Sequence, residues 1–340
     1  MPDSPPTLSP ATALEDRLEQ HRTELVAYCY RMLGSPFEAE DAVQDTLLRG
    51  WRKIDSFREE AALRSWLYRI ATNVCLDMLD SRQRRALPMD LGPASEPLEA
   101  NLRTQPEAWW VQPIPDGRIV EEGDPADVAV ARETVRLAFI AALQHLPPRQ
   151  RAVLILCEVL RWQASEVAEL LETSVASVNS ALQRARAGLA AAKVDTEHPP
   201  GELTDADRRL LAEYVDAFER YDVDRLTRVI QQDATQSMPP FDMWLNGRDD
   251  IFRWWFGPGI GCRGSRMIRT VDANGSPAFG QYKPSVNGNG YDPWALQVID
   301  VSGGRIGQLT FFLDTPTLFP LFGLPDRLDA QGIGQARELQ

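Results

Sequence analysis

The stretch LPPRQRAVLILCEVLRWQASEVAELLETSVASVNSALQRARAGL, from Leu146 to Leu189, decides the fold of this part of the chain. Its second half predicts two short helices joined by a tight turn. We expect Ser165 to cap the first helix and Ser174 the second, with Glu172 and Thr173 between them. Apolar side chains of the second helix recur at helical spacing, which predicts one buried face made of Val178, Leu182, Ala185 and Leu189.

The other faces of the second helix are polar, and the helix ends in arginines. A short polar helix held across a sharp turn is typical of a helix-turn-helix, whose second helix can enter the major groove of DNA. An ordinary helical hairpin is the alternative. The candidate DNA-contacting residues are Ser174, Ser177, Asn179, Ser180, Gln183, Arg184 and Arg186.

The same stretch resembles region 4 of bacterial RNA polymerase sigma factors of the extracytoplasmic-function group. The leading LPPRQR, the apolar helix after it and the closing ALQRAR carry the resemblance. It implies that residues 132–193 form a region 4 domain and that the candidates above bind the −35 promoter element. The recognition helix has fewer cations near Asn179 and Ala181 than the family usually has, so we expect weaker −35 binding that depends more on hydrogen bonds.

A second helix signal begins at Ser35, where serine can cap, Pro36 takes the first helical position and Glu38 can complete a capping box. The helix that follows is expected to bury Ala39, Val43, Leu47, Trp51 and Ile54. A solvated charged face is one interpretation of its outer side. The resemblance implies instead region 2.2, which docks on the clamp of core RNA polymerase through Glu40, Asp41, Gln44, Asp45 and Arg49.

The next helix, RSWLYRIATNVCLDMLDSRQRR, resembles regions 2.3 and 2.4, which open the −10 element and hold bases of the exposed strand. That task needs cations for phosphates and flat or polar groups for splayed bases. The −10 candidates, which the resemblance places with the loop 57–63, are Arg64, Trp66, Arg69, Asn73, Asp77 and Arg82. Tyr68 could also stack on a base, and core packing is the alternative for Trp66.

The charge of the chain is unevenly distributed. The net charge of the 340 residues is −13, but residues 21–87 carry +1 and residues 132–193 carry +3, whereas 88–131 and 194–340 carry −7 each. Phosphate contacts dominate non-specific DNA affinity, so the acidic remainder would repel free DNA. A protein that meets DNA only within a larger complex tolerates this balance.

The segments between the candidate domains are interpreted as linkers. Residues 1–20 form a Pro-rich leader, and residues 21–87 a region 2 domain. Residues 88–131 are rich in Pro, Gly and acids, which predicts a linker that is flexible or draped over a partner, such as a basic channel of the polymerase. The pair Trp109-Trp110 suggests that part of it docks. A second linker covers 194–203.

Residues 204–320 are expected to form an α+β domain, with two or three helices followed by the strand-like runs SRMIRTVDANG, PAFGQYKP, DPWALQVIDV and RIGQLTFFLD. The patterns YVDAFERYDVDRL and MPPFDMWLNGRDDI resemble the SnoaL-like cone, a fold related to nuclear transport factor 2. The tail 321–340 begins with an apolar, Pro-broken stretch that could pack on another domain.

Aromatic residues could line the interior of this cone and bind an apolar small ligand, or they could simply fill the core: Phe241, Trp244, Trp254, Trp255, Trp294 and Phe311. No histidine follows His198, which excludes a His-dependent catalytic dyad in this domain. Carboxylates remain as possible bases, but nothing in the sequence pairs them with a second catalytic group: Asp242, Asp249, Asp250, Asp292 and Asp314.

The predicted fold class is therefore multidomain, with two all-α sigma domains followed by an α+β SnoaL-like domain. The resemblance implies a sigma factor that binds the clamp and flap of core RNA polymerase, directs it to −10 and −35 elements and assists melting, without a catalytic step, cofactor or metal of its own. The C-terminal domain is expected to contact the sigma domains and modulate activity. A SnoaL-fold enzyme or ligand sensor fused to a helix-turn-helix regulator, and a repressor acting without polymerase, are the alternatives.

A cytoplasmic location is expected. The N-terminus lacks a signal-peptide pattern, and no apolar run reaches the ~20 residues that span a membrane. The four cysteines are isolated in sequence, which predicts buried reduced thiols rather than a metal or redox site.

Overall fold

The computed structural model describes residues 17–53, 63–80, 84–120, 128, 131–191 and 203–333. The chain forms two compact units. The first contains the described parts of Met1–Arg84, Arg118–Gly123 and Ala142–Val194, and the second those of Arg85–Gly117, Asp124–Ala141 and Asp195–Gln340.

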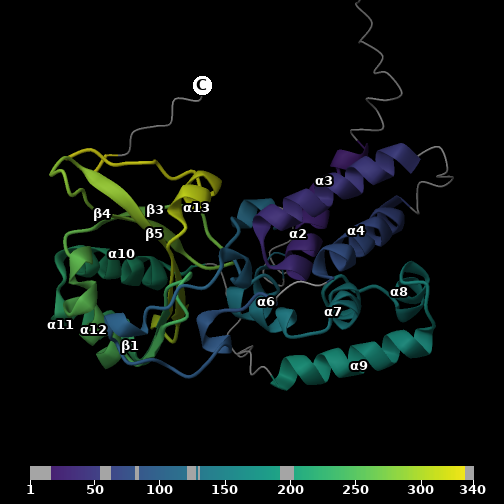
Figure 1. The fold of residues 1–340 in the computed structure, drawn as a ribbon, viewed down its shortest axis with the longest axis horizontal. Helices are drawn as coiled ribbons and strands as arrows, with labels where there is room; N and C mark the ends of the chain where they lie inside the picture. Colours follow the sequence, from purple (N-terminus) through teal and green to yellow (C-terminus); the bar gives the residue numbers. More distant parts are fainter. Residues whose placement is uncertain are drawn as a thin grey trace, which may run out of the picture. The chain divides into compact units, whose positions relative to one another are not determined.

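The first unit begins with three helices that pack together, α2 (Arg22–Leu33), α3 (Pro36–Lys53) and α4 (Leu63–Leu79) (Figure 1). Gly34 ends α2 in the left-handed conformation with φ 72°, and the Ser35 hydroxyl accepts a hydrogen bond from the Glu38 amide at 3.4 Å. The predicted helix start at Ser35 is therefore confirmed. Ala39 and Val43 are buried, as their spacing predicted, and Leu25, Cys29 and Met32 of α2 are buried as well.

The remainder of the first unit contains α7 (Pro148–Leu154), a π-helical turn (Ile155–Val159), α8 (Ala164–Leu170) and α9 (Val175–Ala191). Helix α9 packs on α7 and α8 (Figure 1). The Ser174 hydroxyl accepts from the Ser177 amide at 3.1 Å, which confirms the predicted cap. The prediction for Ser165 was wrong: α8 starts earlier, at Ala164, because the Glu166 carboxylate caps the Gln163 amide at 2.7 Å. Helix α6 (Leu137–Gln144) joins the two units in sequence.

The second unit is built on a six-stranded sheet of order β2-β1-β6-β5-β4-β3. Strands β1 and β6 are parallel, and the other neighbours are antiparallel. The strands are β1 (Ile230–Ser237), β2 (Trp244–Asn246), β3 (Arg266–Arg269), β4 (Ala278–Pro284), β5 (Tyr291–Ser302) and β6 (Arg305–Phe312). The helices are α10 (Asp205–Arg220), α11 (Val223–Val229), α12 (Arg248–Phe256) and α13 (Thr315–Leu321), with a 3-10 turn at Pro258–Cys262.

The sheet is covered on both faces. Tyr214 and Phe218 of α10 and Trp255 of α12 form one apolar core with Ile299 and Leu309 of the sheet. On the opposite face, Phe319 of α13 packs edge-to-face against Tyr282 of β4, with ring centroids 5.2 Å apart. A Cβ atom at Gly280 would lie 2.8 Å from Leu324, so the tail is tightly packed there. The described part of the tail thus covers its own sheet.

The α+β prediction for this region is confirmed, and all four expected strands are present. Two further strands were missed. Strand β1 has the sequence IQQDATQS, which carries almost no β-branched or aromatic residues and continues directly from α11. It lies inside the sheet because Ile230 and Ala234 pack into the core while Gln236 accepts the indole N–H of Trp255 at 2.7 Å. Such a polar central strand has no periodic signal.

Residues 85–117, which we call the inter-region strap, belong to the second unit. The expectation of a separate linker over 88–131 is corrected for this part. Near strand β2 the Ser95 amide donates to the Trp244 carbonyl at 2.8 Å. The Gln105 amide donates to the Pro240 carbonyl at 2.9 Å. Trp110 is buried, in agreement with the expectation that the tryptophan pair docks. The strap contains four 3-10 turns: Pro88–Asp90, Glu99–Asn101, Glu107–Trp109 and Asp116–Arg118, the last of which continues one residue beyond it.

The far end of the strap meets the tip of the β3–β4 hairpin. Asn274 and Gly275 have φ of 55° and 74°, as a two-residue type I′ turn requires. The Gly275 amide donates to Asp116 Oδ1 at 2.8 Å, and Arg132 Nε lies 3.7 Å from Asp116 Oδ2. Burial raises the pKa of Asp116 to about 6, and the nearby Asp272 carboxylate also acts to raise this pKa. The charges of Arg132 and Arg269 act in the opposite direction and lower it.

We expect this raised pKa to make the strap contact pH-dependent. The folded-state pKa of Asp116 lies above the ordinary value of 3.8, so the folded chain binds the proton more tightly and gains stability as pH falls through about 6 towards 4. Asp116→Asn retains an acceptor for Gly275 and removes the titration. Relative to this variant, the wild type should gain about 2 kcal/mol of unfolding free energy over that interval. Urea unfolding of both proteins at several pH values measures the difference; a pH-independent difference would contradict it.

Candidate nucleic-acid interface

The recognition helix α9 and its cap expose every candidate DNA-contacting residue. Val178 and Ala185 are fully buried, whereas Leu182 and Leu189 are only half-buried. The exposed side chains are Ser174, Ser177, Asn179, Ser180, Gln183, Arg184 and Arg186. Arg186 also pairs with Glu158 of the π-helical turn, with its Nε 3.2 Å from the carboxylate. Its guanidinium is therefore already engaged within the chain.

Helix α4 presents a polar stripe along one face. Arg69, Asn73 and Asp77 are spaced four residues apart, Asn73 and Asp77 are exposed, and Arg69 is half-buried. Arg64 is exposed at the start of the helix, where it binds Glu24 at 2.7 Å, and Trp66 is half-buried. The sixth −10 candidate, Arg82, and the loop from 57 to 62 lie outside the described residues.

The suggestion that Tyr68 stacks on a base was wrong. Its ring is fully buried between Tyr28 and Trp162, each with a ring centroid 5.1 Å away, and its hydroxyl donates to Glu24 at 3.1 Å. Trp162 was not singled out in the sequence. It follows the π-helical turn, where no periodic pattern marks it, and Arg64 lies 5.5 Å from its ring centroid.

The outer face of α3 combines polar and apolar side chains. Asp41 and Gln44 are exposed, and Leu48 and Trp51 are 44% and 50% exposed. Trp51 was expected in the core, and that prediction was wrong. Each four-residue step overshoots a helical turn by about 40°, so three steps from Ala39 rotate Trp51 about 120° away from the buried face. Ile54, the next residue in that pattern, lies outside the described residues.

Three of the predicted polymerase-contacting residues on α3 take part in ion pairs. Asp45 binds Arg49 at 2.8 Å within the helix. Glu40 binds Arg22 at 3.3 Å and Arg118 at 3.0 Å. These exposed or half-exposed pairs are weak in water, so a partner could exchange them at small cost.

The six aromatic residues proposed for a ligand pocket are mostly packed. Trp254, Trp255 and Phe311 are buried in the core of the second unit, and Phe241 and Trp294 pack against it. The indole N–H of Trp244 donates to the carbonyl of Gly92 in the strap at 2.9 Å. These contacts favour core filling, and the ligand remains a hypothesis.

The described residues contain no cluster of three or more metal-ligating side chains. No helix among them is long and apolar enough to cross a membrane.

Comparisons with known proteins match both helical regions. Residues 18–85 match the family model for sigma-70 region 2, and residues 136–189 match that for sigma-70 region 4. The chain is 44% identical over 316 residues to the ECF RNA polymerase sigma factor SigG of Mycobacterium tuberculosis, covering 91% of this chain and 83% of SigG. It is 26% identical over 335 residues to SigJ of the same organism, covering 94% and 97%.

The chain belongs to the ECF RNA polymerase sigma factors. It therefore directs core RNA polymerase to promoters through regions 2 and 4. The crystal structure of M. tuberculosis SigJ, an extracytoplasmic-function sigma factor, has the same fold, with a TM-score of 0.60 and 22% sequence identity over 91% of this chain and 99% of that one. The prediction of two helical sigma domains followed by an α+β domain is confirmed.

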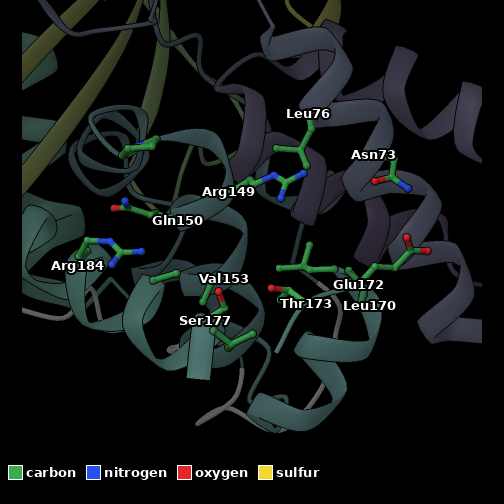
Figure 2. Close-up of a pocket in the computed structure, with 14 residues that line it drawn as sticks. Asn73, Leu76, Arg149, Gln150, Val153, Leu170, Glu172, Thr173, Ser177 and Arg184 are labelled. Atoms are coloured by element: carbon green, nitrogen blue, oxygen red, sulfur yellow. The ribbon is translucent and has the colours of Figure 1, made fainter. Parts of the chain in front are cut away.

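Regions 2 and 4 of this sigma factor lie against each other within the first unit. A cleft of about 340 Å³ separates α4 from the helix-turn-helix. Figure 2 shows Asn73 and Leu76 on one side and Ser177 and Arg184 on the other, with Arg149 extending towards Leu76. The cleft thus gathers candidates for both promoter elements. Sequence reasoning did not single out Arg149, Gln150, Glu172 or Thr173 as lining residues, because only the packing of the two regions brings them there.

One buried guanidinium joins the two regions. Arg151 is 2% exposed and donates to the carbonyls of Met32, at the end of α2, Gln144 and Leu146, and to Gln144 Oε1 at 2.6 Å. Gln144 Nε2 in turn donates to the carbonyl of Arg31 at 3.3 Å. Burial lowers the pKa of Arg151 to about 10, which leaves it protonated at neutral pH. The cation therefore satisfies carbonyls that helix ends leave without partners.

We expect Arg151→Leu to loosen region 4 from region 2. The buried carbonyls would lose their donor, and the free energy of unfolding should fall by about 2–4 kcal/mol. The control is Arg149→Leu, a neighbouring exposed arginine, whose effect should stay within about 0.5 kcal/mol. Urea unfolding of the three proteins provides the measurement. Equal losses in the two variants would show that the buried guanidinium has no special role.

Proposed function

We propose that this sigma factor divides promoter recognition among three exposed surfaces. The stripe Arg69–Asn73–Asp77 with Arg64, Trp66 and Arg82 contacts the −10 element. The exposed residues of α9 contact the −35 element while region 4 binds the polymerase flap. The outer face of α3 docks on the clamp. The exposure of these residues on helices that match regions 2 and 4 is the observation that supports the proposal.

The α3 surface has the composition of a protein interface. Leu48 and Trp51 are exposed beside Asp41 and Gln44 on one helix. Exposed tryptophans rimmed by polar groups are typical of the centre of binding interfaces, because their burial releases much water-exposed apolar area. The charge pattern alone did not indicate Leu48 and Trp51 as part of this patch.

Promoter binding requires regions 2 and 4 to separate. The −10 and −35 elements lie about 25 base pairs apart, which is about 85 Å along B-form DNA. The first unit instead holds α4 and α9 around a single cleft, with Arg151 joining α2 to region 4. We infer that this arrangement is a closed form and that core polymerase opens it. The C-terminal domain would modulate this step.

We expect Trp51→Ala to weaken binding to core polymerase about tenfold or more, because an exposed tryptophan at an interface centre contributes strongly. Its half-exposed position predicts little change in unfolding free energy. Val286→Ala, a fully exposed apolar residue between β4 and β5, is the matched control. Titration of labelled core polymerase measures the affinity. If the two variants bind alike, α3 does not dock through this patch.

For −35 recognition we expect Arg184→Ala to reduce promoter affinity of the assembled holoenzyme by about 1–3 kcal/mol and to lower its salt dependence if the contact is to a phosphate. Arg186→Ala should cost less, because Glu158 already holds that guanidinium. Run-off transcription and promoter binding at several salt concentrations measure both. A larger loss for Arg186→Ala would contradict the assignment.

A further inference from the structure

A row of hydrogen-bonded polar side chains crosses the interior of the second unit. The Tyr214 hydroxyl of α10 donates to Gln297 Oε1 of β5 at 2.8 Å, and Gln297 Nε2 donates to Gln281 Oε1 of β4 at 2.9 Å. Gln281 Nε2 donates to Ser265 Oγ at 3.0 Å. All four residues are 0% exposed. The row leads out of the core to the 3-10 turn Pro258–Cys262, where Ser265 Oγ donates to the Cys262 carbonyl at 2.6 Å.

Lys283 continues this row at the rim of the sheet. It follows Gln281 by two residues on β4, so both side chains lie on the same face. Its Nζ atom lies 3.2 Å from the ring centroid of Trp294, which is the extra residue of a bulge in β5. Bulges re-aim side chains, and this one places the indole ring against the ammonium group.

The ammonium group of Lys283 has an aromatic partner but no carboxylate partner among the residues that the structure describes. Asp292 is its cross-strand partner in the β4–β5 ladder, yet that carboxylate binds Arg327 Nε at 3.3 Å. Burial raises the pKa values of the Cys262 thiol and the Tyr221 phenol, so both groups are neutral at neutral pH. The cation therefore lacks an anion, although residues 194–340 carry a net charge of −7.

A second cation lies on the turn next to Lys283. A Cβ atom at Gly261 would lie 3.9 Å from Lys283 Nζ and would meet no other atom within 4 Å outside the turn itself. Arg263 follows two residues later, is exposed, and pairs with no carboxylate in the described part of the chain. Its charge acts on the phenol of Tyr221, whose hydroxyl donates to the Gly259 carbonyl at 3.4 Å. The bare backbone at Gly261 thus leaves space beside two cations.

The side chains around this space are apolar. Ile260 of the same turn is 45% exposed. Phe256 is half-buried and packs edge-to-face against Tyr221, with ring centroids 5.3 Å apart. Cations beside aliphatic and aromatic groups suit a molecule that has an anionic head and an apolar body, because charge-assisted hydrogen bonds fix the head while the body covers apolar surface.

We propose that the C-terminal domain binds a small organic carboxylate at this rim. The carboxylate accepts hydrogen bonds from Lys283 and Arg263 and enters beside Gly261, where no side chain stands. The apolar body lies against Ile260 and Phe256. The proposal is independent of promoter recognition, since binding requires neither polymerase nor DNA.

The lysines of the chain provide a local reporter. The sequence contains only three of them, Lys53, Lys193 and Lys283, so carbon-13 labelling of lysine in the full chain places one signal at the site and two elsewhere. Lys283→Met assigns the signal of the site. The probe is benzoate. Benzyl alcohol is its neutral counterpart, and inorganic phosphate is an anion without an apolar body.

We expect benzoate to shift the Lys283 signal saturably and to leave the signals of Lys53 and Lys193 in place. Isothermal titration calorimetry should show that benzoate binds about tenfold or more tightly than benzyl alcohol or phosphate, because only benzoate satisfies both the cations and the apolar side chains.

Variants of the full chain test the named residues. Arg263→Gln should weaken benzoate binding about tenfold through the loss of a charge-assisted hydrogen bond, and Lys283→Met should abolish it. Gly261→Ala keeps both cations but fills the space beside Lys283, so it should weaken binding as well. Arg305→Gln is the matched control, because it makes the same exchange at another exposed arginine, at the start of β6.

Three results would overturn the carboxylate site. The first is a Lys283 signal that benzoate does not move, or that moves together with both other lysine signals. The second is binding of benzyl alcohol or phosphate as tight as that of benzoate. The third is equal benzoate affinity in Arg263→Gln and Arg305→Gln, a comparison that retains Lys283 and so does not depend on the folding of Lys283→Met.

Discussion

The Arg151 guanidinium is the interaction that joins regions 2 and 4 in the first unit. It is a buried cation bonded to carbonyl oxygens and one amide oxygen, and those carbonyls come from α2 in region 2 and from the chain around α6 in region 4. A carboxylate partner would neutralise the charge but leave the carbonyls at the helix ends unsatisfied. The bond set joins elements more than 100 residues apart in sequence.

The second unit adds a constraint on the same connection from outside the sigma regions. Its sheet is complete and covered on both faces, yet strap residues pair with the chain beside β2 and with the β3–β4 turn. The C-terminal domain is therefore attached to the segment between the promoter-binding regions, and not only to the chain after them.

Particular residues show where sequence reasoning succeeded. Ser35 and Ser174 cap helices as predicted, because capping depends on groups three residues away. The exposed face of α9 followed from helical spacing. The prediction that Trp51 is buried failed because a four-residue repeat drifts around the helix. The prediction that Tyr68 stacks on a base failed because Trp162, from a distant segment, covers its ring. Strand β1 was not predicted, because its polar residues are buried by tertiary contacts alone.

The sequence by itself determined the sigma-factor regions, the recognition helix, the helix caps at Ser35 and Ser174, and four of the six strands of the C-terminal domain. These depend on periodicity, turn residues and local motifs, which act over a few residues. Only the tertiary structure decided that the acidic segment packs as a strap, that Arg151 closes region 4 onto region 2, and that Asn274 bridges Ile114 and Val135. Each of these joins residues far apart in the chain, and a buried polar group finds such partners only once the fold brings them together.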